Sequence, residues 1–215
     1  MKILLIGACG RMGHEVVIAA REKHDEIIAG IDHRESHEFD FPVYNDISKV
    51  DQNADVIIDF STCQDRTSFF EFAEKNKIPY CCFSTNLSCV DEMGIRELSK
   101  KVKVLKCANA SLGINAMFDL VEKSCELLPS ADVVIEEYHH KEKKDTPSGT
   151  AKKIEDILQE NQMNFTTAAF RVGNERGTHL VKLFLEDEVL EIKHTANSRK
   201  IFAYGAIEKA KRLLN

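Results

Sequence analysis

One short segment of the chain gathers side chains that can donate protons and bind anions. Residues 139–144, HHKEKK, place two histidines and three lysines within six residues. Histidine titrates near neutral pH, and a neighbouring lysine adds a second proton donor. The segment leads into Pro147-Ser148-Gly149-Thr150, and Ser148 is a typical first residue before a helix. Cations beside the amides of a helix start suit a small dicarboxylate, whereas a merely solvated basic loop is disfavoured by the His-His pair and the helix entry.

A second candidate site is the glycine-rich segment GACGRMG at residues 7–13, which follows an apolar run. Gly7 permits a tight turn, Gly10 lets the backbone approach a pyrophosphate, and Gly13 lets the following helix pack closely. Asp32 comes nineteen residues after Gly13, where a carboxylate can bind ribose hydroxyls. The pattern predicts NADH or NADPH as cofactor. Asp32 slightly favours NADH, although His33 and Arg34 can partly neutralise a 2′-phosphate; a ligand-free turn is the alternative that Asp32 disfavours.

The elements that must position these residues alternate in the first half of the chain. We expect strands at 3–6, 27–32, 56–60, 78–83 and 102–107, with helices at 11–23, around 69–73 and at 93–100. Strands that are apolar on both faces and separated by helices indicate a parallel sheet covered on both sides. The sequence therefore predicts an α/β fold with a doubly wound, Rossmann-type domain at residues 1–110, completed by residues 198–215.

The second half has a different pattern, and the change falls near residue 110. We expect helices at 114–128, 148–159 and 199–214, and strands at 133–138, 167–172, 179–185 and 189–194. The last three strands are expected to be antiparallel and joined by short turns. Residues 111–197 are therefore predicted to form an α+β domain with a mainly antiparallel sheet, joined through a hinge at Asn109–Gly113.

Composition limits the classes of partner. The net charge of −6 disfavours nucleic acid, and no apolar run of the 215 residues approaches the length of a membrane span. The start of the chain, MKILLI, reads as a strand and not as a signal peptide. Seven cysteines, an odd number without CxxC pairs, indicate buried thiols, no metal site and a reducing, cytoplasmic location.

Several motifs along the whole chain match one known family. They are GACGRMG at 7–13, DVIIDFS at 55–61, Ala108-Asn109 with Ser111-x-Gly113-x-Asn115, HH…K.D.PSGTA at 139–151, Gly177-x-His179, and His194 with SR at 198–199 and FA.GA at 202–206. On these residues the chain resembles the 4-hydroxy-tetrahydrodipicolinate reductase (dihydrodipicolinate reductase) family, as a short member. The resemblance implies NAD(P)H-dependent reduction of an unsaturated ring with two carboxylates, in lysine and diaminopimelate biosynthesis.

The resemblance also implies a role for individual residues. His139 would be the acid/base residue and Lys143 the proton donor. The substrate would be bound by His140, Ser148, Gly149 and Thr150. The cofactor would be lined by Gly7, Ala8, Cys9, Gly10, Arg11, Met12, Asp32, Phe83, Ser84, Thr85, Cys107, Ala108, Asn109 and Ala110. The family further implies a homotetramer built through the sheet of the second domain.

Two departures from the family pattern concern the cofactor. The turn that reads Gly-Thr-Thr-Gly in the family is Phe83-Ser84-Thr85-Asn86 here, and Ala110 replaces an aromatic residue. Two other functions stay open at this point. One is another NAD(P)-dependent imine or amino-acid dehydrogenase, which the His-His loop disfavours. The other is a non-catalytic nucleotide-sensing protein on the same fold, which only the two departures support. His179 and His194 either lie near the substrate or brace the sheet.

Overall fold

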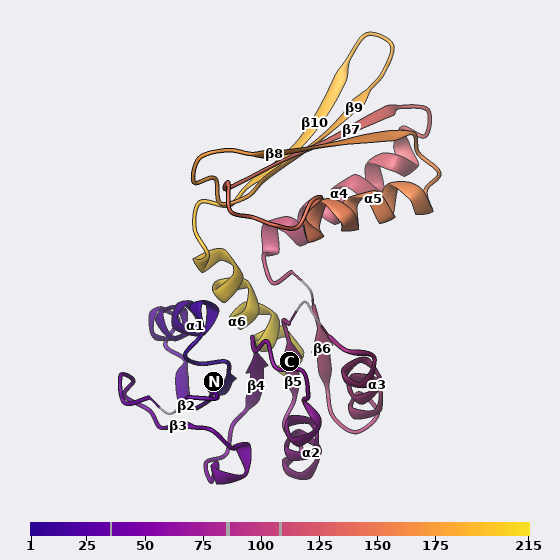
Figure 1. Cartoon of the computed structure of the whole chain (residues 1–215). Coiled ribbons are helices and arrows are strands. Elements are labelled where there is room, and N and C mark those ends of the chain that lie inside the picture. The colour runs from indigo at the N-terminus through magenta and orange to yellow at the C-terminus, as the bar shows by residue number, and fades with distance from the viewer. Residues whose placement is uncertain (35, 85–86, 108) are drawn as a thin grey trace. The chain divides into compact units, whose positions relative to one another are not determined.

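Six parallel strands form the first sheet of the computed structural model, which describes residues 1–34, 36–84, 87–107 and 109–215 (Figure 1). The strands are β1 (Lys2–Ile6), β2 (Glu26–Ile31), β3 (Val43–Tyr44), β4 (Val56–Asp59), β5 (Tyr80–Cys82) and β6 (Val104–Lys106). Their order is β3-β2-β1-β4-β5-β6, the order of the dinucleotide-binding fold. The predicted α/β class is confirmed; the two-residue strand β3 is an addition to the expected strands.

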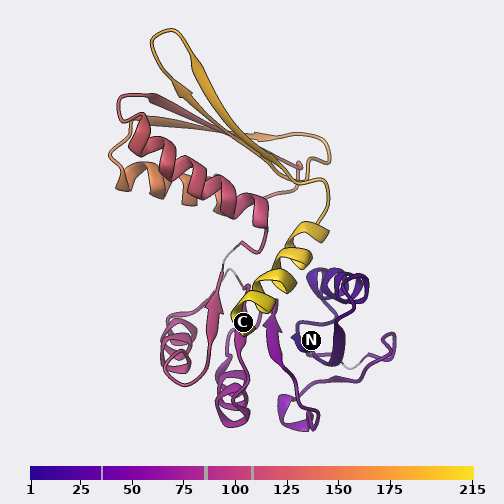
Figure 2. The ribbon, with the colours of Figure 1, turned by 180° about the vertical axis from the view of Figure 1, so that it is seen from behind.

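Helices cover both faces of this sheet because successive strand residues point to opposite sides. On one face Ile3, Leu5 and Ile58 pack with α1 (Arg11–Glu22) and α6 (Lys200–Leu214). On the other face Leu4 and Ile57 pack with α2 (Thr67–Asn76), α3 (Cys89–Leu98) and the short 3-10 helix η1 (Ile47–Lys49). The last helix, α6, lies beside α1 (Figure 2) and so completes the layer that the first helix begins.

The second sheet has the strand order β10-β9-β7-β8. Its strands are β7 (Asp132–His139), β8 (Phe165–Arg171), β9 (Thr178–Phe184) and β10 (Val189–Thr195). The helices α4 (Leu112–Leu127) and α5 (Gly149–Glu160) lie on the same face (Figure 1), where Val133, Ile135 and Val181 pack with Ile154 and Leu158 in a separate core. The mainly antiparallel character is confirmed.

The predicted pairing of β8 in this sheet is wrong. The three late strands were expected to pair in antiparallel succession, but β8 runs parallel to β7 at the edge, whereas β9 pairs with β7 and β10. Helix α5 connects β7 to β8, and such a crossover is what a parallel pair requires.

Two compact units result from this arrangement. Met1–Ser111 and Lys200–Asn215 form the first unit, and Leu112–Arg199 form the second. The chain therefore leaves the first unit once and returns to it with α6. Within the described part of the chain, no helix has the length and apolar character needed to cross a membrane.

Candidate functional site

The glycine-rich segment forms a tight turn between β1 and α1. Gly7 has a φ of +83°, in the left-handed region that favours glycine. At Gly13 a Cβ atom would lie 2.2 Å from the Ala8 carbonyl oxygen and 2.3 Å from that of Gly7, so only glycine fits. Gly10 caps α1, and the first N–H groups of a helix have no acceptor within the helix. The turn therefore presents backbone donors of the kind that bind phosphate oxygens.

Asp32, just after β2, lies against this turn. Its Oδ2 accepts the Cys9 backbone N–H at 3.0 Å, and its Oδ1 lies 2.8 Å from Nδ1 of His33. The carboxylate side chain is only 7% exposed, whereas the His33 ring is 81% exposed. The structure thus joins the predicted glycine turn and the predicted acid, and it leaves an imidazole at the outer side of the acid.

The remaining predicted cofactor residues follow β5 and β6. Phe83 is buried and stacks on Phe60 with ring centroids 5.1 Å apart, so its side chain belongs to the core. Ala110 is also buried in that core, and the Cys107 thiol donates to the Asn109 carbonyl at 3.0 Å. The Ser84 hydroxyl donates to the Ser61 carbonyl. Two further predictions, Thr85 and Ala108, lie outside the described residues.

A buried ion cluster lies beneath the loop that follows β4. The Arg66 guanidinium donates from Nε to Asp59 and from Nη1 to Asp91, both at 3.0 Å, and all three side chains are almost fully enclosed. Nη2 donates to the Ser61 carbonyl, and the Tyr80 hydroxyl donates to Asp59. Because Phe60 and Ser61 lie against Gly7, the cluster fixes the wall of the glycine turn.

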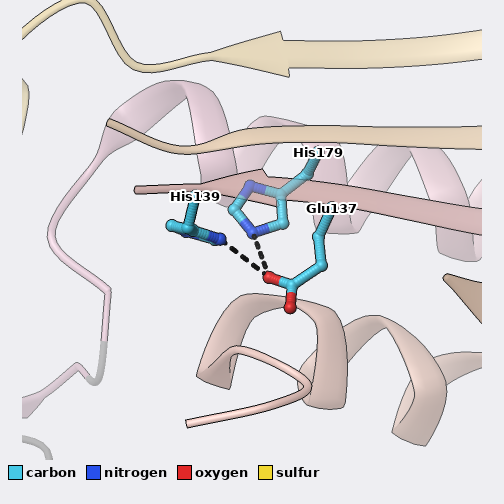
Figure 3. A group of neighbouring side chains, drawn as sticks. All are labelled: Glu137, His139 and His179. Atoms are coloured by element: carbon cyan, nitrogen blue, oxygen red, sulfur yellow. Dashed lines mark ion pairs between the residues drawn. The ribbon is translucent and has the colours of Figure 1, made fainter. Parts of the chain in front are cut away.

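The second set of functional side chains lies at the end of β7. Glu137 and His139 are two residues apart, so they point to the same face of the sheet, toward the helices. In the register of the sheet, Glu137 is opposite His179 on β9, and His139 is opposite Arg171 on β8. Figure 3 shows both imidazole rings directed at one oxygen of the Glu137 carboxylate. Three strands therefore bring their polar side chains to one point.

The contacts of Glu137 divide between its two oxygens. Oε2 lies 2.9 Å from Nδ1 of His139 and 4.0 Å from Nε2 of His179. This contact with His139 lies within ion-pair distance, although neither atom has a well-aligned hydrogen-bond partner among the described residues. Oε1 accepts a hydrogen bond from Nη2 of Arg171 at 2.9 Å and one from the Ser148 backbone N–H at 3.1 Å.

These contacts shift two pKa values. Burial opposes ionisation of Glu137, but the interactions with His139, Ser148 and Arg171 prevail and hold the pKa of Glu137 well below its usual range. Burial lowers the pKa of His179 to about 4, and the neighbouring His139 lowers it further, against the attraction of Glu137. At neutral pH the cluster therefore contains an anionic Glu137 and an uncharged His179.

The predicted substrate-binding residues surround the start of α5. The Ser148 hydroxyl accepts the Ala151 N–H and lies 3.1 Å from Nε2 of His179, so this buried side chain is engaged within the protein. Gly149 is exposed, with no atom within 4 Å of a Cβ built on it, while His140 and Thr150 are half-buried. The Lys143 N–H closes a turn on the His140 carbonyl, and Nζ of Lys143 lies 2.9 Å from both oxygens of Asp145.

The group Glu137, His139 and His179 also has the residue types of a metal site. One ligand atom from each lies within 4.8 Å of the others. However, the Arg171 guanidinium already neutralises the carboxylate, and Nε2 of His179 is in contact with Ser148. A divalent cation would have to enter beside this positive charge and displace a contact. The donor set therefore fits protons better than a metal, and the expectation of no metal site stays a prediction.

Sequence reasoning missed Glu137 and Arg171. A signal for Glu137 was present, because alternation on a strand places it on the buried face with Ile135 and His139. An acid at such a position needs a partner. Nothing local identified Arg171, whose contact with Glu137 depends on the parallel pairing of β8 with β7.

Comparison with known proteins covers both units. A family model described as "Dihydrodipicolinate reductase, N-terminus" matches residues 1–110, and one described as "Dihydrodipicolinate reductase, C-terminus" matches residues 113–215.

Two curated relatives and one solved structure extend this finding. A 4-hydroxy-tetrahydrodipicolinate reductase of Caldanaerobacter subterraneus subsp. tengcongensis is 36% identical over 234 aligned positions, covering 100% of this chain and 93% of the relative. Another, from Thermosipho africanus, is 36% identical and covers 100% of this chain and 92% of the relative. A dipicolinate-bound dihydrodipicolinate reductase of Paenisporosarcina sp. TG-14 has the same fold, with a TM-score of 0.82, 18% identity and coverage of 100% and 94%.

Proposed function

The chain belongs to the dihydrodipicolinate reductase family, and from this premise we propose that it reduces 4-hydroxy-tetrahydrodipicolinate to tetrahydrodipicolinate with NADH or NADPH. Both parts of the family pattern are present in one chain, and the reaction belongs to lysine and diaminopimelate biosynthesis. The observation that carries the proposal for this chain is the braced His139 at the end of β7, beside the Lys143 turn and the start of α5.

The first unit fits a nicotinamide dinucleotide. Gly7 and Gly13 remove the side chains that would fill the turn, and the amides at the start of α1 suit the pyrophosphate. Residues 7–12, Asp32, Phe83, Ser84, Thr85 and Cys107–Ala110 are our proposed cofactor-binding residues, with Phe83 and Ala110 contributing backbone atoms. When bound, the cofactor supplies the hydride. We therefore assign residues 1–110 and 198–215 to cofactor binding and residues 111–197 to substrate binding and assembly.

We propose a modest preference for NADH. The Asp32 carboxylate is held in place by the Cys9 N–H and can accept hydrogen bonds from ribose hydroxyls, but it repels a 2′-phosphate. His33 and Arg34 follow directly and limit this repulsion. The expected outcome is use of both cofactors, with the higher kcat/KM for NADH.

The second unit supplies proton donors and substrate binding. Hydride addition to a conjugated imine places negative charge on the ring, and a proton must be delivered to complete the reaction. We propose that His139 is the acid/base residue and that the ammonium group of Lys143, which lies 2.9 Å from the Asp145 carboxylate, donates the proton. The substrate carboxylates are assigned to His140, Gly149 and Thr150 at the start of α5, where Ser148 contributes through its cap.

The proposal includes the setting of the enzyme. We propose a cytoplasmic homotetramer with a small heterocyclic dicarboxylate as substrate and with neither nucleic acid nor membrane as partner. The net charge of −6 and the seven cysteines, free in the structure, are consistent with this setting.

A coupled assay tests the function directly. The unstable substrate is generated in place by the preceding synthase, and the loss of NADH or NADPH absorbance is followed in separate reactions. We expect turnover with both cofactors. His139→Gln and Lys143→Ala are expected to keep NADH binding and to lose most of the turnover, because each removes a proton donor.

Three other results would contradict the proposal. Full turnover by both variants would remove the catalytic assignment. Turnover of aspartate semialdehyde or of a linear imino acid in place of the ring would identify a different dehydrogenase. Calorimetric NADH binding without turnover of any of these compounds would identify a nucleotide-sensing protein.

A further inference from the structure

Glu137 is a fully buried anion to which the proposed reaction gives no role. It lies on the helix-covered face of β7, and its side chain is 0% exposed. Desolvating a carboxylate is costly unless it is paired and hydrogen-bonded, and here its two oxygens contact four groups. A buried charge with this many partners, next to a proposed acid/base residue, calls for a functional explanation.

One oxygen of Glu137 fixes the orientation of the other. Oε1 accepts from the Arg171 guanidinium and from the Ser148 backbone N–H, and both of these groups can only donate. The carboxylate therefore cannot rotate, and Oε2 stays 2.9 Å from Nδ1 of His139. An anion at this point favours a proton on Nδ1, so Nε2 is the nitrogen that remains for exchange with the substrate.

A glycine lies beside the other ring nitrogen of His139. A Cβ atom at Gly177 would lie 3.1 Å from Nε2 of His139, and Gly177 has a φ of +142° that other residues rarely adopt. The two ring nitrogens therefore have different surroundings: a buried anion faces Nδ1, and a residue without a side chain lies beside Nε2.

Arg171 links Glu137 to the turn that carries Lys143. Besides Glu137, its Nη2 donates to the Asp145 carbonyl at 2.7 Å and to the Thr146 hydroxyl at 3.0 Å. Its Nε donates to the Lys143 carbonyl at 3.3 Å. The guanidinium thus ties the backbone of the Lys143 turn to the carboxylate that faces His139.

We propose that Glu137 is a positioning residue. It determines directly which ring nitrogen of His139 carries the proton, and through Arg171 it holds the backbone of the Lys143 turn in place. This inference rests on the proposed function, because it concerns the two proton donors assigned there. It makes one buried carboxylate the common support of both donors, so that they are oriented together.

Glu137→Gln tests the proposal with little change of shape. The donors Arg171 and Ser148 force the amide oxygen of the glutamine to their side, so its NH2 group faces Nδ1 of His139. Nδ1 must then accept, and the proton moves to Nε2. We expect kcat to fall at least about tenfold, while the KM for the substrate and the Kd for NADH change less than about twofold.

Three further variants separate positioning from folding. Glu160→Gln is the control, since it makes the same chemical change at an exposed position at the end of α5 in the same unit; it should behave as wild type. Glu137→Asp keeps the charge and should retain the wild-type tautomer at a reduced kcat. Arg171→Met should lower kcat without moving the proton of His139. If Glu137 only stabilised the fold, Glu137→Gln would lower the melting temperature and leave the ring tautomer of His139 unchanged.

A spectroscopic readout decides the question without turnover. In protein labelled with 15N-histidine, the ring nitrogen shifts of His139, assigned by their loss in His139→Gln, report which nitrogen carries the proton. We expect Nδ1–H in the wild type and Nε2–H in Glu137→Gln. The same tautomer in both proteins, or a wild-type kcat in Glu137→Gln, would overturn the inference. Absence of turnover in the wild type would instead overturn the proposed function, and the ring spectra would still decide the role of Glu137.

Discussion

At the scale of single residues, the interior of the first unit depends on an ion cluster and not only on apolar side chains. The Arg66 side chain is 0% exposed and lies between Asp59 and Asp91. A buried pair of this kind need not stabilise more than apolar residues of equal volume, but removing one partner leaves a buried charge without compensation. The cluster therefore makes the loop after β4 sensitive to a single substitution.

Arg66→Met is expected to lower the free energy of unfolding by about 3–5 kcal/mol, because Asp59 and Asp91 lose their counter-ion. Urea denaturation monitored by circular dichroism measures the change. Lys101→Met, which removes an exposed pair with Glu74, is the control and should cost less than about 1 kcal/mol. Equal effects of the two substitutions would contradict the assigned importance of the buried cluster.

His179 makes stability depend on pH in the opposite sense to an ordinary ion-paired histidine. Its folded pKa of about 4 lies below the unfolded value of 6.5, so the unfolded chain binds more protons between these values. Stability is therefore fully present above pH 6.5 and is lost as the pH falls toward 4. Burial of His194 acts in the same direction, whereas the carboxylate of Glu137 contributes its loss only below about pH 4.5.

Between pH 7 and pH 5 the wild type should lose up to about 2 kcal/mol more unfolding free energy than His179→Gln. The glutamine stays uncharged at both values, so the variant lacks this proton uptake. Urea unfolding of both proteins at the two pH values gives the comparison. Identical pH dependence in both would show that His179 titrates normally in the folded state.

The site residues differed in how far the sequence could identify them. His139 and Lys143 could be identified from the sequence because they belong to one short segment of unusual composition, which continues to Thr150. Glu137 was not singled out, because an acid before a histidine reads as solvated until the buried face of the strand is known. Arg171 comes 32 positions after His139, and only the register of β7 and β8 makes them neighbours.

At the scale of elements, the first sheet was predictable because each strand carries its own signal. Apolar runs buried on both faces mark β1, β2, β4 and β5 regardless of their neighbours. The position of β8 in the second sheet was not predictable, because the alternating residues of a strand define its two faces but do not identify the strand with which it pairs. The strand–helix–strand order of β7, α5 and β8 was the available signal for a parallel pair, but the short turns expected between the late strands favoured antiparallel pairing.

Gly13→Ala is expected to raise the Kd for NADH at least about tenfold, which corresponds to about 1.4 kcal/mol. The new Cβ would collide with the carbonyl oxygens of Gly7 and Ala8 and force the turn and α1 apart. Fluorescence titration with NADH measures the Kd. Ile18→Ala, at an exposed position of the same helix, should leave it unchanged. Unaltered NADH binding by Gly13→Ala would remove the turn from the proposed cofactor site.

At the scale of the whole molecule, the second sheet is covered by helices on one face. On the other face, within the described part of the chain, apolar side chains lie among ion pairs. Phe170 stacks on Tyr138, Phe184 is opposite Val189, and Lys182 pairs with Glu136. Exposed aromatic side chains are enriched at surfaces between subunits, and charged groups belong to the rim of such surfaces. It gives the proposed homotetramer a definite surface.

Phe184→Asp is expected to dissociate the tetramer, because it places a charge among the apolar side chains of this face. Size-exclusion chromatography with light scattering should show the mass of four chains for the wild type and a smaller mass for the variant. Val90→Asp, on the exposed side of α3 in the first unit, serves as control. A monomeric wild type, or an unchanged mass of Phe184→Asp, would contradict assembly through this sheet.

Helix α6 gives the molecule a particular order of synthesis. Ala203, Ala206 and Ile207 close the core over β1 and β4, yet they emerge from the ribosome after the entire second unit. During translation of the next ninety or so residues, the face of the first sheet that α6 later covers is therefore only partly buried. During that interval its exposed apolar side is open to chaperones and to aggregation. A chain that ends before α6 would therefore leave the core of the first unit incompletely covered.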